Sequence, residues 1–208
     1  MLKRLSSLQQ IQQAGKRFMI QASQEIIDPR IRRTRQLLCQ SLVTLLETKD
    51  FDKISVQDIA EAATVNRVTF YDHYSDKFAL LESVVDSRFN ELLARRGVRF
   101  DRTCSSALTG IVLAVCDYLS GTPGIESARR RMMEPHLESA VIAVVRRMIL
   151  EGLTQHPPDI PVTPEMVATT LSWAIYGAAQ EWVRTPNRPA SDEIVGPLVR
   201  LVAPLLGH

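Results

Sequence analysis

The sequence contains few cysteines, few aromatic residues and no long apolar run. Its three cysteines, Cys39, Cys104 and Cys116, form no close pair and have no histidine at metal-ligand spacing. This pattern excludes a disulfide scaffold and favours buried thiols in a reducing compartment. The most apolar segment, residues 140–150, contains Arg146 and Arg147 and is far shorter than the roughly 20 residues of a membrane span. We therefore expect no membrane partner.

The chain begins Met-Leu-Lys-Arg, but glutamines follow where a secretion signal would have an apolar stretch, so we expect a cytoplasmic protein. Its 208 residues are 45% hydrophobic and 23% charged, which is typical of a globular protein with one or two domains. The formal net charge of +2 is too small to indicate a nucleic-acid partner by itself. The first 100 residues carry +4 and the remainder −2, so any anionic partner is expected to meet the first part.

Helical signals follow one another along the first half of the chain. Residues 1–27 predict a weakly amphipathic N-terminal extension. Asp28 and Pro29 are typical of a helix start and predict a helix over residues 30–48, whose first turns carry Arg30, Arg32, Arg33 and Arg35. A solvated surface is the simplest explanation of that charge run.

Two short helices and a longer one are predicted next. Ser55 with Asp58 three residues later is a capping pattern and predicts a helix over 55–63. Asn66 caps a second short helix, and Ser75-Asp76 caps a third that ends near Arg95-Arg96-Gly97. Two short helices joined by a turn of three to four residues indicate a helix-turn-helix.

The second half predicts an antiparallel helical bundle. Helices are expected over 104–120, 134–154, 163–184 and 191–206, separated by Gly- or Pro-containing segments. Pro197 and Pro204 should kink or shorten the last helix. The fold class is therefore all-α, with an N-terminal three-helix helix-turn-helix domain and a C-terminal bundle.

The stretch from about residue 32 to residue 92 resembles the DNA-binding domain of TetR-type transcriptional regulators. The matching residues, in register, are Phe51, Ser55-Val56, Asp58-Ile59-Ala60, Ala63, Val65, Thr69-Phe70-Tyr71, His73, Lys77 and Leu80-Leu81. The resemblance implies a DNA-binding domain over 28–97 and a ligand-binding and dimerisation domain over 98–208. It further implies a homodimeric repressor that a small-molecule effector releases from a double-stranded DNA operator. The aromatic and methionine side chains of the second half, and not the resemblance, favour an apolar or aromatic effector.

Two residues depart from the family pattern. Thr64 stands where the family usually has glycine, and a β-branched residue tolerates positive φ badly, so the turn is expected to take another geometry. Asp72 stands where a base-reading side chain is common, and its carboxylate can accept from cytosine N4 but repels phosphate. We expect an unusual operator sequence as a result.

The second short helix is the predicted reader of DNA. Arg67 suits guanine, the methyl groups of Val68 and Thr69 suit thymine, and Phe70 should face the domain core. By resemblance, Tyr71, His73 and Lys77 contact the DNA backbone, and free amides at the start of the helix of Lys77 favour a phosphate there. Ser55 and Arg33 are secondary phosphate candidates.

The C-terminal half carries two predicted sets of residues. An effector cavity is expected among aromatic, methionine and histidine side chains, namely Tyr118, Met133, His136, Met148, Trp173 and Tyr176. A dimer interface is expected from the apolar faces of the last two helices, namely Leu171, Ala174, Ala178, Trp182, Leu198 and Leu201. Core packing is the alternative for each of these residues.

No catalytic pattern accompanies these features. The histidines at 73, 136, 156 and 208 form no metal-spaced cluster, and the sequence has no G-x-S-x-G, P-loop or paired-carboxylate motif. We therefore predict a non-enzyme without metal or cofactor. An all-helical enzyme and a helical protein-interaction module, each containing a pair of helices like a helix-turn-helix, are the alternatives.

Overall fold

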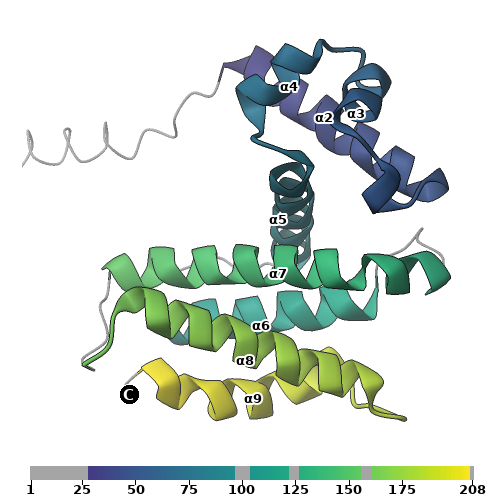
Figure 1. Ribbon diagram of the computed structural model, residues 1–208. Helices are drawn as coiled ribbons and strands as arrows, with labels where there is room; N and C mark the ends of the chain where they lie inside the picture. Colours follow the sequence, from purple (N-terminus) through teal and green to yellow (C-terminus); the bar gives the residue numbers. More distant parts are fainter. Residues whose placement is uncertain (1–27, 97–103, 122–126, 156–160, 207–208) are drawn as a thin grey trace, which may run out of the picture. The chain divides into compact units, whose positions relative to one another are not determined.

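The computed structural model describes residues 28–96, 104–121, 127–155 and 161–206, and these form helices without any strand. The chain divides into two compact units, residues 1–37 and residues 38–208. The elements are α2 (Pro29–Thr48), η1 (Phe51–Lys53), α3 (Val56–Ala62), α4 (Arg67–His73), α5 (Lys77–Arg95), α6 (Cys104–Ser120), α7 (Ser127–Gln155), α8 (Pro164–Arg184), α9 (Ser191–Val202) and η2 (Ala203–Leu206) (Figure 1). The predicted all-α class is confirmed, whereas the predicted extension over 1–27 lies outside the described residues.

The helices of the first half start where their capping residues predicted. Asp28 Oδ1 accepts a hydrogen bond from the Arg30 amide (2.9 Å) at the start of α2. Asp76 Oδ1 accepts from the amides of Phe78 (2.9 Å) and Ala79 (2.8 Å) at the start of α5. These bonds satisfy amides that a helix leaves without an intrahelical partner.

The bounds of α7 and α9 differ from those that the sequence predicted. Helix α7 begins at Ser127 and not at 134, so Pro135 lies inside it. Helix α9 continues through Pro197 but ends at Val202, and Pro204 lies in η2, so the prediction that a proline would shorten the last helix is confirmed at Pro204. A proline removes only one amide donor, so neighbouring turns and packing can hold a helix on both sides of it.

One continuous apolar core runs through residues 38–208. In its N-terminal part the fully buried side chains include Phe51, Phe70 and Phe89, which confirms the prediction that Phe70 faces inward. Helix α5 carries this core onward, since it packs against both α6 and α7. The core therefore connects the helix-turn-helix region to the C-terminal bundle.

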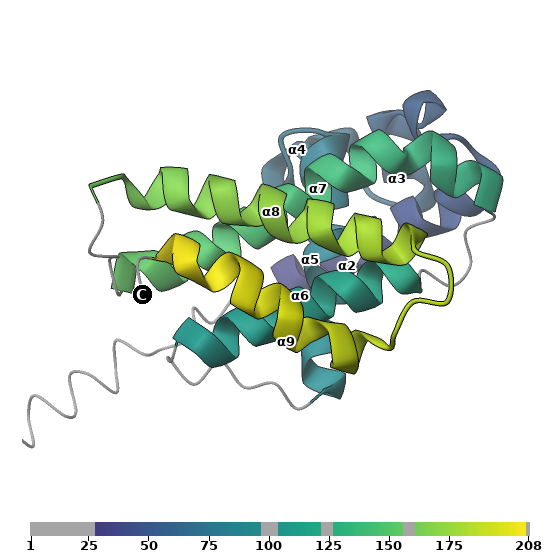
Figure 2. The same cartoon turned by 90° about the horizontal axis from the view of Figure 1, so that it is seen from below.

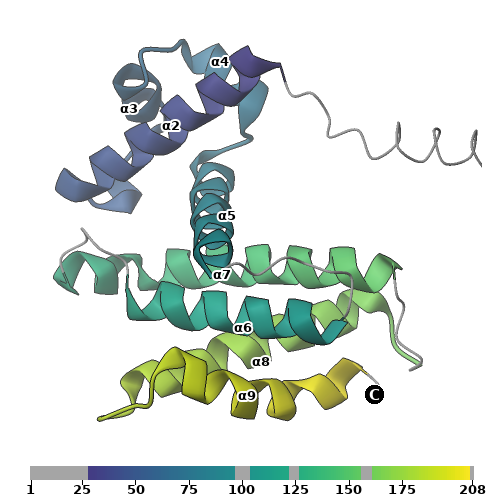
Figure 3. The ribbon, with the colours of Figure 1, turned by 180° about the vertical axis from the view of Figure 1, so that it is seen from behind.

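Helices α6 to α9 form the predicted antiparallel bundle (Figures 2 and 3). Helix α8 packs against α6, α7 and α9, and α9 also packs against α6. The α8–α9 loop is held by Trp182, whose Nε1 donates to the carbonyl of Pro189 (3.1 Å) and whose ring lies 4.7 Å from the guanidinium of Arg188. Within the described residues, no helix has the length and apolar content that a bilayer crossing requires.

Candidate nucleic-acid interface

Helix α3 begins with reciprocal hydrogen bonds between Ser55 and Asp58. The Asp58 amide donates to Ser55 Oγ (3.1 Å), and Asp58 Oδ2 accepts from the Ser55 hydroxyl (2.6 Å) and the Ser55 amide (2.7 Å). With Lys49 Nζ 2.9 Å from the same oxygen, these bonds hold the pKa of the Asp58 carboxyl well below its ordinary value. The Ser55 hydroxyl proton is used inside this cap, so the predicted phosphate contact from Ser55 would require the cap to open.

The turn between α3 and α4 keeps a left-handed geometry although a threonine occupies it. Thr64 has φ 56°, its amide donates to the carbonyl of Glu61 (3.0 Å), and the Val65 amide donates to the carbonyl of Ala60 (2.9 Å). This pair of bonds is the Schellman arrangement, which requires positive φ at its central residue. The expectation that Thr64 would force another geometry is therefore wrong, because the two backbone bonds and the surrounding packing hold the residue in a conformation it disfavours.

Helix α4 is oriented by one cap and one buried ring. Asn66 Oδ1 accepts from the Val68 amide (2.9 Å), and the ring of Phe70 lies fully inside the core. With Phe70 directed inward, the helical period directs Val68, Tyr71 and Asp72 outward, and all three are exposed. Arg67, at the first position of α4, is exposed as well. Thr69 is half-buried at the edge of this face.

The outward face of α4 exposes an unusual amount of apolar and aromatic surface. Val68 is 66% exposed and Tyr71 is 47% exposed. Arg67 and Tyr71, one helical turn apart, interact: Arg67 Nη2 donates to the Tyr71 hydroxyl (3.1 Å), and the guanidinium carbon lies 5.5 Å from the Tyr71 ring centre. A guanidinium, an aromatic hydroxyl, a valine methyl pair and a carboxylate are thus all exposed on α4.

Lys77 departs from its predicted role. Its ammonium donates to the backbone carbonyls of Phe51 (2.9 Å), Asp52 (3.1 Å) and Ile54 (2.9 Å) and lies 4.7 Å from the Phe51 ring centre. The amides at the start of α5 are also engaged, by Asp76. A phosphate contact from Lys77 would cost all three carbonyl bonds, so we remove Lys77 from the set of DNA contacts.

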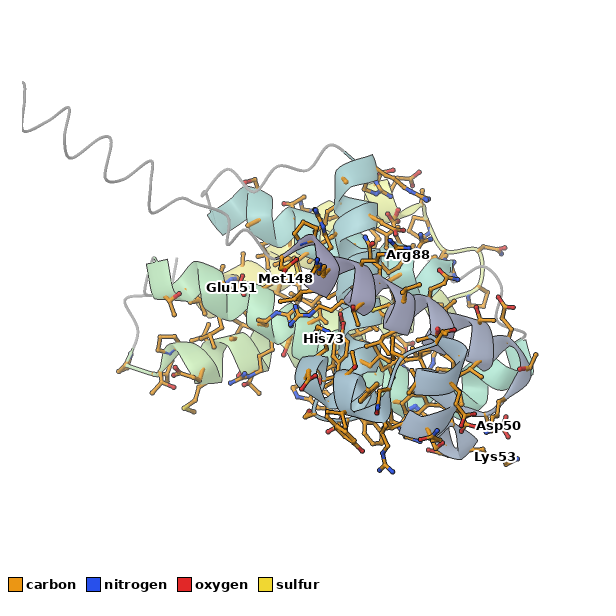
Figure 4. All side chains as sticks on the ribbon, turned by 90° about the horizontal axis from the view of Figure 1, so that it is seen from above. Asp50, Lys53, His73, Arg88, Met148 and Glu151 are labelled. Atoms are coloured by element: carbon orange, nitrogen blue, oxygen red, sulfur yellow. The ribbon has the colours of Figure 1, made fainter. Side chains whose placement is uncertain are left out.

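The remaining predicted backbone contacts are His73 and Arg33. His73, labelled in Figure 4, is half-buried at the last position of α4. Arg33 is exposed in the second turn of α2. Both phosphate contacts stay predictions.

A contact between the helix-turn-helix region and α7 was missed by the sequence prediction. His136 Nε2 lies 2.9 Å from Asp52 Oδ1, and the His136 ring centre lies 4.9 Å from that of Phe51 and 5.7 Å from that of Phe78. His136, which we expected in an effector cavity, therefore contacts η1 and the first turn of α5. The sequence offers no signal for this pairing, because His136 and Asp52 are 84 positions apart.

A second contact joins the end of α5 to the bundle. Arg96 donates to both carboxylate oxygens of Asp117 on α6 (2.5 and 2.8 Å), to Ser191 Oγ (2.8 Å) and to Asp192 at the start of α9. These carboxylates raise the pKa of Arg96, with the Asp117 hydrogen bond as the largest cause. Helix α5 is thus tied to the bundle at both of its ends.

The other predicted effector residues separate into buried and exposed groups. Tyr118, Met133 and Tyr176 are buried, and burial raises the pKa of Tyr176 to about 12. Met148 is half-buried. Trp173 is 54% exposed on α8, so it does not line an interior cavity, and its assignment to the effector site is corrected.

The predicted dimer residues also separate. Leu171 and Trp182 are buried within the protomer and belong to its core, so their assignment to an outward face is corrected. Ala174, Ala178 and Leu198 are half-buried, and Leu201 is 69% exposed. The sequence prediction missed the exposed apolar residues Met166 and Leu205. Since Met166 and Trp173 are seven positions apart, helical spacing alone would have placed them on one face.

The cysteines whose side chains are described fit the expectation of buried thiols. Cys116 is buried, and the burial raises the pKa of its thiol to about 12, so the thiol is uncharged at neutral pH. Cys39 is half-buried against the hydroxyls of Tyr74 (3.7 Å) and Ser83 (3.8 Å). In the part of the chain that the structure describes, no three metal-ligating side chains come together.

Known proteins resemble the chain in both sequence and fold. Residues 41–84 match the profile of the bacterial regulatory proteins of the tetR family. The uncharacterised HTH-type transcriptional regulator YxbF of Bacillus subtilis is 35% identical over 157 residues, which cover 73% of this chain and 40% of that protein. The HTH-type transcriptional regulator EthR of Mycolicibacterium smegmatis is 42% identical over 62 residues, which cover 30% of this chain and 27% of that protein.

A solved structure supports the fold assignment. A TetR-family regulator from Streptomyces coelicolor superposes with a TM-score of 0.57 at 15% identity, covering 85% of this chain and 96% of that one. The chain spans less than half the length of each of the two relatives named above.

Proposed function

Because the chain belongs to the TetR family of bacterial regulatory proteins, we propose that it is a transcriptional regulator that binds double-stranded DNA through α4. The observation that carries this proposal is the outward face of α4, where Arg67, Val68, Tyr71 and Asp72 are exposed on a helix whose opposite side is fixed in the core by Phe70. A helix presented in this way fits the major groove and can reach base edges. The cytoplasm, which holds the chromosome, is the proposed place of action.

The proposed contacts follow the chemistry of each side chain. Arg67 pairs with guanine, Val68 and Thr69 contact thymine methyl groups, and Asp72 accepts from cytosine N4. Tyr71, His73 and Arg33 contact the DNA backbone. In this proposal, residues 28–97 recognise DNA and residues 98–208 bind the effector and a second protomer.

The proposed partner of the exposed apolar face is a second copy of this chain. Met166 and Trp173 on α8, Leu201 on α9 and Leu205 on η2 expose large apolar side chains, and α8 packs against both α9 and η2. A two-fold dimer buries such a patch twice and matches a palindromic operator. Ala174, Ala178 and Leu198 complete the face.

The proposed effector is a small apolar or aromatic molecule that lowers operator affinity, which makes the protein a repressor. The apolar and aromatic side chains Tyr118, Met133 and Tyr176 support an effector of this chemistry. The contacts of His136 with Asp52 and of Arg96 with Asp117 support a path by which a change in the bundle reaches the helix-turn-helix region.

Selection of bound duplexes from a random DNA pool tests the function, with Arg67→Ala as the comparison. We expect the wild type to enrich a palindromic sequence, and Arg67→Ala to lose preference at one base position and about 1–3 kcal/mol per half-site. A wild-type protein that enriches no sequence, or a variant with wild-type preference, would overturn the proposal.

A further inference from the structure

The contact between Arg67 and Tyr71 is a hydrogen bond between two exposed side chains of α4. An exposed arginine ordinarily samples many rotamers and loses rotamer entropy when it is fixed. Reading guanine with two hydrogen bonds requires the guanidinium plane to be aligned with the base edge. A partner that restricts the guanidinium before DNA arrives therefore raises discrimination, because less freedom is lost on binding.

Tyr71 is itself held by the core. Its ring centre lies 5.5 Å from that of Phe70, and the two planes meet at 86° in an edge-to-face contact. Phe70 is fully buried. Buried Phe70 therefore restrains the Tyr71 ring, and Tyr71 in turn restrains the guanidinium of Arg67.

We propose that Tyr71 is a specificity-determining residue that positions Arg67 for base recognition, in addition to any contact of its own with the DNA backbone. This inference rests on the proposed function. A neutral partner suits the role, because it orients the guanidinium without cancelling the charge that attracts guanine O6 and N7. An aspartate at the same place would hold the side chain but neutralise it.

The hydroxyl of Tyr71 has the capacity for both tasks. A phenolic oxygen accepts one hydrogen bond and donates another. It accepts from Arg67, so its own proton is available for a phosphate oxygen. In this proposal Tyr71 contacts a phosphate and Arg67 at the same time, so it sets the position of Arg67 relative to the DNA backbone.

The two roles of Tyr71 predict different results for Tyr71→Phe. Loss of a phosphate contact weakens binding to every duplex equally, whereas loss of positioning lowers discrimination at the base that Arg67 reads. The duplexes needed are the selected operator and a variant changed at the base position that Arg67→Ala identifies. Discrimination is the ratio of the two dissociation constants at fixed salt.

We expect Tyr71→Phe to lower this ratio about threefold to tenfold per half-site, the effect of one lost hydrogen bond. In the Arg67→Ala background the same change should leave the ratio unaltered, since no guanidinium remains to be positioned. Tyr74→Phe is the matched control: it removes a hydroxyl in the same region, 3.0 Å from Ser83 Oγ, and should leave discrimination unchanged.

The melting temperature of each variant is measured to test whether the protein is folded. Uniformly weaker binding by Tyr71→Phe with wild-type discrimination would overturn the positioning role while leaving the proposed function intact. Failure of the wild type to enrich any sequence would overturn both.

Discussion

The backbone strain at Thr64 makes a quantitative prediction for Thr64→Gly. The residue has φ 56°, and the left-handed conformation costs an L-residue roughly 1–2 kcal/mol. Glycine removes this cost but adds freedom to the unfolded chain, which offsets about 0.4–1 kcal/mol. We expect Thr64→Gly to raise the free energy of unfolding by about 0.5–1 kcal/mol, which for a chain of this size raises Tm by about 1–4 °C.

Asn187 provides the matched control. It has φ 54°, nearly the same conformation, but asparagine tolerates that region far better than threonine. Asn187→Gly should therefore leave the free energy of unfolding unchanged or lower it by a few tenths of a kcal/mol. Thr64→Asn should raise the free energy of unfolding, but by less than Thr64→Gly does.

Urea unfolding and differential scanning calorimetry at one protein concentration measure these differences. Thr64→Gly should also keep wild-type DNA preference, because the turn already has the geometry that glycine adopts freely. Equal or lower stability of Thr64→Gly would refute the reasoning, since it would show that threonine pays no conformational cost in this turn.

Three further predictions concern other parts of the molecule. The lowered pKa of Asp58, ordinarily 3.8, means that its contribution to stability is present above about pH 4 and is lost as pH falls through the lowered value. Asp58→Asn should therefore flatten the acid limb of the unfolding free energy plotted against pH, and an unchanged limb would contradict the capping geometry. His136→Ala should lower the free energy of unfolding by about 1–2 kcal/mol in urea titrations, because it removes ring packing and the bond to Asp52; unchanged stability would show that this contact contributes nothing. Trp173→Glu should convert a dimer to monomers in sedimentation velocity, and dimers of unchanged affinity would remove α8 from the proposed interface.

Local rules predicted the helix-turn-helix region well. The caps at Ser55, Asn66 and Asp76 start their helices as expected, because each cap depends on a side chain and amides only two or three residues away. The inward direction of Phe70 follows from the helical period in the same way. Which side chains of α4 are buried and which are exposed therefore follows from these local signals.

The start of α7 and the buried side of α8 were harder to predict. The sequence predicted a helix from residue 134, whereas α7 begins at Ser127 and contains Pro135. Helix α8 is apolar on two sides, and periodicity cannot tell which side turns inward. Packing against α6 and α7 placed Leu171 in the core and left Trp173 outside.

The sequence by itself determined the short helices of the helix-turn-helix region, their caps and the inward direction of Phe70, because these depend on residues within one or two turns of each other. Only the tertiary structure decided that Lys77 binds the carbonyls around η1 and that His136 meets Asp52. Those contacts join segments that are distant in sequence, and a long polar side chain takes whichever partner the packed backbone brings within reach. Apolar spacing carries no information about such partners.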